Sequence, residues 1–223
     1  MQLSIIVPTL NEAAQIDATL RSLASLRGRG VEIIVVDGGS TDTTVDAARR
    51  LSSAVLQGTA RGRAAQMNAG AAHASGDALL FLHADTLLPS NADALVDQAL
   101  QSHDWGRFDV TLDGKHPLLR VVEAMMNWRS RATGIATGDQ AIFVRRSVFE
   151  AVGGFPHQAL MEDIDLCATL KRRGAPATLR ARATTSARRW EKHGIVRTIV
   201  KMWWLRAAYF FGASAETIAR WYR

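Results

Sequence analysis

Short aliphatic runs alternate with segments of helical spacing through the first half of the chain, and this alternation restricts the fold more than any other feature. Four runs have the length of buried strands: 3–7, 31–36, 54–56 and 78–82. A segment predicted to be helical follows each of them: 12–26, 42–51, 62–74 and 91–102. Strands and helices in regular alternation predict a mostly parallel sheet with helices on both faces.

Polar side chains follow these predicted strands, at the edge where open α/β sheets bind their ligands. They are Thr9, Asn11, Glu12, Asp37, His83 and Asp85. Asn11 also has the side chain of a cap for the helix that is expected to start at residue 12. The carboxyl edge of the sheet is therefore the expected place of the chemistry.

The second half of the chain is less regular. It contains two predicted strands, 105–112 and 140–144. Its predicted helices are 117–131, 147–152, 162–173 and 195–211. The chain has 223 residues, 48% of them hydrophobic, and shows no internal repeat or low-complexity linker. We therefore expect one domain with a short appendage.

Cysteine usage and the apolar runs favour a cytoplasmic protein. Cys167 is the single cysteine, so no disulfide forms within the chain, and burial on a helix is its expected role. The first apolar run lacks the basic start and the length of a signal peptide. No uncharged stretch reaches the roughly 18 residues that a spanning helix requires.

Positive charge gathers towards the C-terminal end. From Lys171 onward there are thirteen Lys and Arg residues, opposed by Glu191 and Glu216. Such a segment suits the phosphates of a substrate, anionic lipid or nucleic acid, or it forms a solvated face without a specific partner. Because no recognisable nucleic-acid-binding motif accompanies the charge, we expect no nucleic-acid partner.

Asp37 closes the second aliphatic run and precedes Gly38 and Gly39. A carboxylate at this place can accept a hydrogen bond from a ribose hydroxyl or a base N–H, and the glycines let the backbone approach. The alternative is an Asp that serves only its own turn. No Gly-x-Gly-x-x-Gly pattern occurs here, which argues against a dinucleotide-binding fold.

The segment His83-Ala84-Asp85 ends the fourth run. Mg²⁺ or Mn²⁺ typically takes one or two protein carboxylates and completes its shell with phosphate oxygens and water, so Asp85 is a candidate ligand. If the strand continues to this point, His83 shares a face with Asp85 and is a second ligand or a hydrogen-bond donor. The alternative is that Asp85 only begins the next turn.

Three carboxylates, Glu162, Asp163 and Asp165, occupy four positions at the start of a predicted helix. Neighbouring helical residues point about 100° apart, so the three cannot all face one site. One of them suits a general base. The alternative is an acidic first turn that the helix dipole favours.

Two further segments are candidates for contacts with a diphosphate or an acceptor. Gly138-Asp139-Gln140 lies between a loop and a predicted strand. Arg188-Arg189-Trp190 places two guanidiniums beside an aromatic ring, and arginine binds diphosphates through bidentate contacts. The arginine pair also fits the general basic surface of its segment.

Taken in order, five motifs resemble those of family 2 glycosyltransferases with the GT-A fold. They are IIVPTLNE at 5–12, VVDGGSTD at 35–42, NAG at 68–70, LFLHAD at 80–85, and GGF at 153–155 followed by Glu162-Asp163. The resemblance implies a single GT-A-type α/β domain over residues 1–190, with a nucleotide-binding half (1–100) and an acceptor half (101–190). A C-terminal helical extension, 191–223, completes the implied organisation.

A narrower resemblance points to the radical-SAM/selenodomain-associated transferase group of that family. It is carried by GRAAQMN at 62–68, HADT at 83–86 and SARRW at 186–190. Arg189-Trp190 also resembles the end of the Gln-x-x-Arg-Trp motif of processive members. Ser186 stands where that motif has Gln, so processive synthesis is not implied.

The resemblance implies a role for each site residue. The nucleotide-sugar pocket is implied to contain Pro8, Thr9, Asn11, Glu12, Asp37, Gly38, Arg63, Asn68, Ala84 and Asp85. The acceptor or diphosphate is implied to contact Gly138, Asp139, Gln140, Arg189 and Trp190. Asp85 is implied to bind Mn²⁺ or Mg²⁺, with His83, which replaces the first Asp of the family's Asp-x-Asp motif, as a possible second ligand. Asp163, beside Glu162, is implied to be the catalytic base.

The implied reaction moves a sugar from a nucleotide-sugar donor, a UDP-sugar first among the candidates, to a hydroxyl acceptor by a metal-assisted, inverting displacement. One alternative is a catalytically inactive nucleotide-sugar-binding protein of the same fold. Another is a sugar nucleotidyltransferase, although such enzymes usually carry a Gly-rich basic loop after the first strand. Residues 9–13, TLNEA, contain neither glycine nor a basic side chain.

Residues 195–211 combine apolar positions at helical spacing with Arg197, Lys201 and Arg206. In one placement this helix lies in the membrane interface near a lipid-linked acceptor, and the enzyme is peripheral to the inner face of the membrane. In the other, the helix packs on the enzyme's own core or on the second subunit of a homodimer, with its arginines on the wet side.

Overall fold

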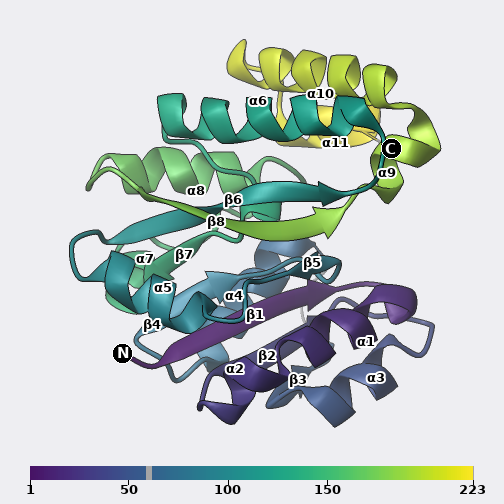
Figure 1. Cartoon of the computed structure of the whole chain (residues 1–223). Coiled ribbons are helices and arrows are strands. Elements are labelled where there is room, and N and C mark those ends of the chain that lie inside the picture. Colours follow the sequence, from purple (N-terminus) through teal and green to yellow (C-terminus); the bar gives the residue numbers. More distant parts are fainter. Residues whose placement is uncertain (59–61, 223) are drawn as a thin grey trace.

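The computed structural model of the chain describes residues 1–58 and 62–222. Within these ranges, eight strands form one sheet in the order β3-β2-β1-β4-β7-β6-β8-β5 (Figure 1). The strands are β1 (Leu3–Thr9), β2 (Glu32–Asp37), β3 (Ala54–Leu56), β4 (Ala78–Phe81), β5 (Thr86–Leu87), β6 (Trp105–Asp113), β7 (Phe143–Arg145) and β8 (Ala177–Ser186). The helices are α1 (Ala13–Ser22), α2 (Ala24–Gly28), α3 (Thr44–Leu51), α4 (Arg63–His73), α5 (Ala92–Leu100), α6 (Pro117–Thr133), α7 (Arg146–Ala151), α8 (Glu162–Lys171), α9 (Arg188–His193), α10 (Ile195–Phe210) and α11 (Ala215–Tyr222), with a short 3-10 helix, η1 (Gly138–Gln140).

The sheet is parallel over the first half of the chain and mixed over the second. β3, β2, β1 and β4 are parallel neighbours, and Thr9 at the end of β1 lies opposite Asp37 at the end of β2. β7 is antiparallel to β4 and to β6, whereas β6 and β8 are parallel. The predicted class, a mostly parallel α/β sheet flanked by helices with a C-terminal helical segment, is confirmed.

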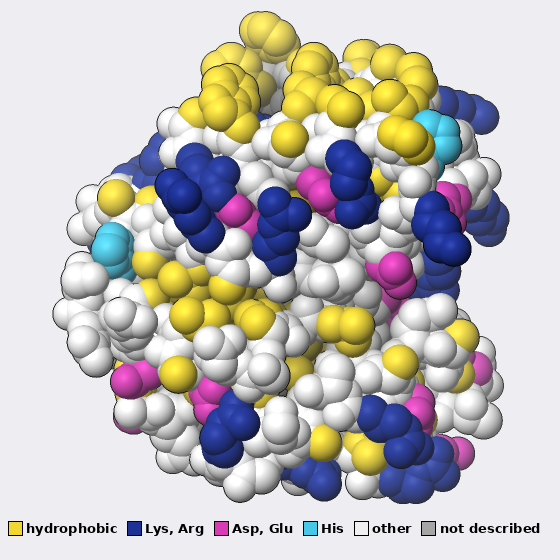
Figure 2. Space-filling view, in the orientation of Figure 1, with side chains coloured by type: hydrophobic (Ala, Val, Ile, Leu, Met, Phe, Trp, Pro, Cys, Tyr) yellow, Lys and Arg dark blue, Asp and Glu magenta, His cyan; other side chains and the backbone are white. Residues whose placement is uncertain are grey.

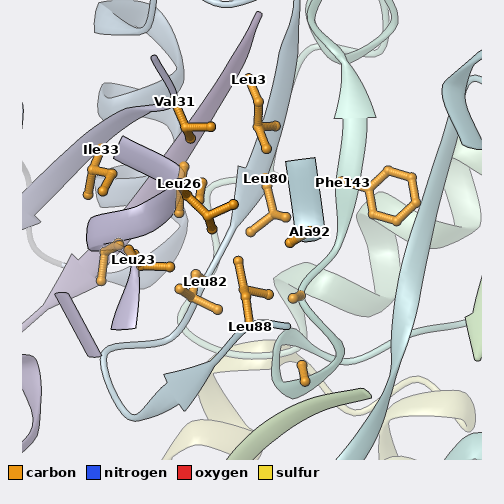
Figure 3. Packing of buried hydrophobic residues seen from close by; sticks show 14 of the residues in the cluster. Leu3, Leu23, Leu26, Val31, Ile33, Leu80, Leu82, Leu88, Ala92 and Phe143 are labelled. Carbon is orange, nitrogen blue, oxygen red and sulfur yellow. The ribbon is translucent and has the colours of Figure 1, made fainter. Parts of the chain in front are cut away.

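The aliphatic strands bury side chains on both faces of the sheet, as sheets covered by helices require. Leu3, Ile5 and Val7 of β1 belong to one core cluster, which α1, α2, α3 and α5 cover. Figure 3 shows part of this cluster, with Leu3, Leu80 and Leu82 close to Leu23 and Leu26. The alternate residues of the strands pack under α4, α7 and α8 in a second cluster.

A third, smaller cluster joins the C-terminal helices to the end of β6. Its buried members are Leu112, Leu119, Val122, Ala187 and Ile195. In Figure 1, α6 and α10 lie together on the outside of the molecule, above β6 and β8. Across residues 1–58 and 62–222, no helix combines the length and the apolar character needed to cross a bilayer.

The helix predicted over 12–26 is two helices, α1 and α2, which meet at Leu23. The prediction that Asn11 caps this helix is wrong. Glu12 holds the cap position, with no side-chain hydrogen bond to the helix. Asn11 has a left-handed backbone (φ 55°), and its side-chain oxygen accepts from the backbone N–H of Thr41 at 2.9 Å. The Asn11 side chain therefore ties the loop after β1 to the loop after β2.

The strand predicted over 140–144 is wrong in its first part. Residues Gly138–Gln140 form η1 with a capping box between Thr137 and Gln140, and Ala141 has a positive φ of 46°. These bonds turn the chain before β7 begins at Phe143. The expectation that His83 and Asp85 share a strand face is also wrong, because β4 ends at Phe81 and both residues lie in the turn before β5.

The ten-residue strand β8 has no counterpart among the predicted strands. Its sequence, ATLRARATTS, alternates small side chains with arginines and threonines and lacks the aliphatic runs of the other strands. Its length is set by pairing with β6, residue against residue from Gly106–Ala177 to Asp113–Ser186, with one irregularity at Phe108/Asp109. Tertiary pairing, rather than local propensity, therefore specifies this strand.

Candidate active site at the carboxyl edge of the sheet

Asp37 is buried at the end of β2, and its carboxylate holds the loop that follows. Its Oδ2 accepts from the backbone N–H of Gly39 at 2.9 Å and of Ser40 at 3.0 Å, and its Oδ1 accepts from the Ser40 hydroxyl at 2.5 Å. Gly39 has a φ of 98°, which an L side chain rarely adopts. Asp37 therefore serves its own turn, and its predicted contact with a nucleotide stays a prediction.

Gln66 of α4 joins the ends of β1 and β2. Its Nε2 donates to the carbonyl oxygens of Thr9 at 2.7 Å and Val36 at 2.8 Å, inside the protein. A Cβ at position 38 would lie 2.9 Å from this nitrogen, which explains the glycine there. Gln66 lies within the motif at 62–68, but no role was assigned to it from the sequence.

Glu12 and Asp85 lie close to one another, and Arg188 contacts both. The Nη2 atom of Arg188 is 3.5 Å from Oε2 of Glu12 and 3.7 Å from Oδ2 of Asp85. Burial, and then the charge of Asp85, raise the pKa of Glu12 above its ordinary value, although Arg188 opposes them. Arg188 is thus the member of the 188–190 segment that reaches the predicted donor pocket.

His83 faces the loop formed by η1. Its Nδ1 is 3.2 Å from Oδ1 of Asp139, and a Cβ at position 138 would lie 2.2 Å from its Nε2, so only glycine fits there. Burial alone would raise the pKa of Asp139. The hydrogen bond and charge of His83, together with more distant arginines, outweigh burial and lower this pKa. His83 is therefore engaged by the acceptor-side loop.

Glu162 and Asp163 begin α8 and differ in their surroundings. Glu162 is buried, and burial followed by the charge of Asp163 raises its pKa. Asp163 accepts from the backbone N–H of Gly138 at 2.9 Å through Oδ2 and from that of Ile164 at 2.8 Å through Oδ1. Two backbone N–H donors thus hold the Asp163 side chain at the start of α8.

A narrow pocket brings several of the predicted residues together. Its lining consists of Arg63, Met67, Phe81, His83, Gly138, Ile142, Phe155, Glu162 and Asp163. The Nη1 atom of Arg63 is 3.9 Å from Oε1 of Glu162, and the charge of Arg63 also acts on Glu12 and Asp139. Arg63 therefore connects Glu12 and Asp139 electrostatically with Glu162, the neighbour of the predicted base.

Other predicted site residues have partners within the protein. Asn68 donates to the carbonyl oxygen of Phe155 at 2.8 Å and accepts from its N–H at 2.9 Å, which fixes the 153–155 loop against α4. Gln140 is buried and donates to the Ser130 hydroxyl at 2.9 Å. The Arg189 guanidinium lies 4.9 Å from the centre of the Tyr222 ring.

Trp190 packs against the third hydrophobic cluster rather than standing free at the sheet edge. Pro8 and Thr9 complete β1, and Ala84 is buried beside Asp85. Within the described residues, no group of three or more His, Cys, Asp and Glu side chains is arranged to hold a metal ion. On the predicted donor side, the carboxylates of Glu12 and Asp85 both lie within 4 Å of Arg188.

Three side chains near the predicted base were not assigned from the sequence: Arg129, Arg206 and Tyr209. The Tyr209 hydroxyl donates to Oδ2 of Asp165 at 2.5 Å. The charge of Asp163 acts on both Arg129 and Arg206. Arg206 recurs at helical spacing with Ile195, Ile199 and Met202, which was a visible signal, but its charge led to the expectation that it faces water.

The family model of "Glycosyl transferase family 2" matches residues 4–153. The match covers β1 to β4, which carry the donor-side carboxylates, and continues through β7. The chain belongs to glycosyl transferase family 2. Membership in the narrower radical-SAM/selenodomain-associated group stays a prediction.

Two kinds of curated relatives are similar in sequence. The PGL/p-HBAD biosynthesis glycosyltransferase of Mycobacterium bovis is 42% identical over 91 residues, which cover 38% of this chain and 36% of that protein. The undecaprenyl-phosphate 4-deoxy-4-formamido-L-arabinose transferase of Pseudomonas aeruginosa is 32% identical over 171 residues, which cover 67% of this chain and 48% of that protein. The chain thus spans about a third to a half of the length of these relatives.

Solved structures share the fold. The mannosyltransferase from Pyrobaculum calidifontis, in complex with GDP-Man and Mn²⁺, has a TM-score of 0.66 and 26% identity, and the match covers 82% of this chain and 56% of that one. TarS of S. aureus, in complex with UDP-GlcNAc, has a TM-score of 0.65 and 20% identity, covering 83% and 58%. The GT-A-type architecture implied by the sequence is confirmed.

Proposed function

We propose that the protein transfers a sugar from a nucleotide-sugar donor to a hydroxyl acceptor, with inversion at the anomeric carbon. One observation supports this proposal above the others. The polar ends of β1, β2 and β4 and the acidic start of α8 lie at one edge of the sheet, and Arg63 acts on both groups. The proposed donor pocket and the proposed base would thus be adjacent, as a displacement between two bound substrates requires.

Asp163 is the proposed base. It takes the proton of the acceptor hydroxyl, whose oxygen forms a bond to the anomeric carbon while the bond to the nucleoside diphosphate breaks. The electron pair of the broken bond leaves with the diphosphate. Arg63 and Arg188 are placed to stabilise the negative charge that develops on this leaving group.

The donor-side carboxylates fit a hard divalent cation. Glu12 and Asp85 offer oxygen ligands, and Mn²⁺ or Mg²⁺ needs one or two protein carboxylates beside water and phosphate oxygens. We assign Asp85 as the protein ligand, with Glu12 beside it, and not His83, whose ring is engaged by Asp139 and Gly138. A bound cation would supply positive charge to the diphosphate.

Calorimetry with UDP- and GDP-sugars, with and without Mn²⁺, tests the donor assignment. The variant Asp85→Asn is expected to lose the Mn²⁺-dependent part of donor binding and to keep the thermal midpoint of the parent. Asp113→Asn, at an exposed carboxylate at the end of β6, is the matched control. Unchanged Mn²⁺-dependent affinity in Asp85→Asn would refute the metal assignment.

The acceptor side carries a broad apolar surface on α6, α10 and α11. Figure 2 shows hydrophobic side chains gathered at the top of the molecule, with Lys and Arg side chains in a row below them. We call this surface the apolar face; its exposed members are Leu118, Val121, Met125, Trp128, Val196, Val200, Trp203, Trp204, Phe210, Phe211 and Trp221. So large an exposed apolar area marks an interaction site.

Helix α10 departs from the placement expected for a packed helix with arginines in water. It packs on α6, α9 and α11 through Ile195, Thr198 and Leu205, as that placement requires. Arg206, however, is half-buried, and Trp203 and Phe210 are 60% and 84% exposed. A helix with its rings outward and basic residues nearby suits the interface of an anionic membrane.

The proposed acceptor is therefore lipid-linked and reached from the membrane interface. One curated relative is itself named as an undecaprenyl-phosphate sugar transferase. Sedimentation with anionic liposomes at low salt tests the proposal with the full chain. Trp203→Glu is expected to reduce liposome binding, whereas Leu10→Glu, at an exposed position outside the apolar face, is expected to leave it unchanged. Absence of binding by the parent would refute the membrane contact.

A further inference from the structure

Two half-buried arginines on the acceptor side have surroundings that the proposed chemistry does not explain. Arg129 lies on α6 and Arg206 on α10, and desolvation lowers the pKa of both. The Nε and Nη2 atoms of Arg129 are buried without a hydrogen-bond partner. Throughout residues 1–58 and 62–222, neither guanidinium lies within 4.0 Å of a carboxylate oxygen.

The two guanidiniums repel one another. Burial, and then the charge of Arg206, lower the pKa of Arg129 to about 10. Burial also lowers the pKa of Arg206. A pKa of about 10 leaves Arg129 charged at neutral pH, so a positive group with two buried, unused donors lies near a second positive group. A charge with unpaired buried donors is costly, and proteins retain such groups where a ligand supplies the partner.

The arginine pair lies on the acceptor side of the predicted base. The charge of Asp163 acts on both arginines, and the charge of Asp139 also acts on Arg129. Tyr209, three residues after Arg206, fixes α10 to α8 through its 2.5 Å bond to Asp165. The same helices that carry the pair, α6 and α10, carry the apolar face on their outer side.

We infer that Arg129 and Arg206 form an anion subsite for the acceptor, and that the acceptor carries a phosphate monoester close to the hydroxyl that reacts. Guanidinium groups bind phosphate oxygens through bidentate, charge-assisted hydrogen bonds, which would use the free Nε and Nη2 atoms of Arg129. The inference rests on the proposed function, because it names the chemistry of that acceptor. The phosphate is a recognition group, and the nucleophile remains the hydroxyl.

The competing explanation is that Arg129 and Arg206 only neutralise the negative charges of Asp163 and Asp139. It predicts ion pairs at contact distance, whereas the Asp163 carboxylate accepts from the Gly138 N–H and the Asp139 carboxylate lies 3.2 Å from His83. It also predicts that loss of Arg129 destabilises the protein. An unfilled anion subsite predicts the opposite, since Arg129→Gln removes a buried charge without a partner.

Binding to the full-length protein tests the inference, with farnesyl phosphate as the probe and farnesol as its uncharged counterpart. Farnesyl phosphate is expected to bind at least about tenfold more tightly than farnesol, because only the phosphate can satisfy the arginines. Arg129→Gln and Arg206→Gln are each expected to weaken farnesyl phosphate by about tenfold or more. Arg197→Gln, at an exposed position of α10, removes the same charge outside the subsite and is expected to bind as the parent does.

Glycerol 3-phosphate, measured in parallel, distinguishes a soluble phosphate from a lipid phosphate. If farnesyl phosphate binds more tightly than glycerol 3-phosphate, the phosphate group belongs to a lipid. If both probes bind equally and both lose affinity in the arginine variants, the subsite stands and its phosphate belongs to a soluble acceptor. The thermal midpoint of unliganded Arg129→Gln is expected to equal or exceed that of the parent. A lowered midpoint with unchanged phosphate affinity, or equal losses in Arg197→Gln, would overturn the inference.

Donor calorimetry separates this inference from the proposed function. If the nucleotide-sugar binds with Mn²⁺ while no phosphate probe binds, the anion subsite is wrong and the transferase proposal stands. If phosphate binds through Arg129 and Arg206 while no nucleotide-sugar binds, the subsite stands and the donor proposal fails.

Discussion

Replacing Gln66 by leucine is expected to loosen the donor edge of the sheet. The side chain is 5% exposed, and its Nε2 donates to two backbone carbonyls, those of Thr9 and Val36, at 2.7 and 2.8 Å. Leucine has a similar volume and no donor, so both bonds are lost while the space stays filled. The Thr9 carbonyl keeps a second bond, from the N–H of Gly38 at 2.9 Å.

The size of the effect follows from these bonds. Each buried hydrogen bond contributes about 1 kcal/mol net, and a carbonyl left poorly satisfied costs about 1–2 kcal/mol more. The free energy of unfolding is therefore expected to fall by about 3 kcal/mol. For a domain of this size, that corresponds to a decrease of roughly 6–12 °C in thermal midpoint. Donor affinity is expected to fall as well, because the loops after β1 and β2 lose their common support.

Thermal unfolding and donor calorimetry on the same preparation measure both effects. Gln98→Leu is the matched control, since Gln98 is exposed on α5, and its change is expected within about 0.5 kcal/mol. If Gln66→Leu unfolds at the same temperature as the control and binds donor as the parent does, Gln66 is not the support that its hydrogen bonds indicate.

Three further outcomes are expected. Asp163→Asn is expected to lower turnover by roughly 10² or more with little change in donor affinity, and a larger loss in Glu162→Gln under steady-state assay would identify the other carboxylate as the base. The pKa of Glu162 is raised above 4.5 in the folded state, so its stabilising contribution is complete below that value and is lost as pH rises through the folded-state pKa. The thermal midpoint of Glu162→Gln relative to that of the parent should therefore be higher at pH 8 than at pH 4, and an offset that does not change with pH would contradict the assigned cause. Cys167 is buried, and burial raises its pKa to about 12. A thiol reagent at pH 8 should therefore label Cys167 only in denaturant. Rapid labelling of the native protein would show that this part of the core opens.

The sequence was most informative where one signal was repeated. The aliphatic runs of β1, β2 and β4 are buried on both faces, so their composition alone identifies them, and the polar residues after them must then meet at one edge. The sequence was less informative about the acidic start of α8 and its contact with Gly138. Order along the chain gave the candidate base, but only the fold shows that a backbone N–H of the η1 loop holds it.

Features that depend on distant partners could not be predicted. The strand β8 has small and basic residues and becomes a strand because β6 and β5 pair with it. Arg206 shares a helical face with Ile195, Ile199 and Met202, but a charged residue of an amphipathic helix is expected in water. Its inward direction follows from how α10 is seated on α6 and α8, which involves contacts across the whole second half of the chain.

The position of Arg188 has a consequence for the order in which the protein becomes functional. Arg188 follows β8, the last strand, yet it contacts Glu12, which is 176 residues earlier in the chain. The proposed donor pocket therefore receives one of its charges only after β8 has taken its place in the sheet. During synthesis from the N-terminus, the strands β1, β2 and β4 emerge first, and the arginine that completes the proposed pocket emerges late. In a nascent chain that ends before Arg188 the proposed pocket is incomplete, and it is completed together with the helices proposed to face the acceptor.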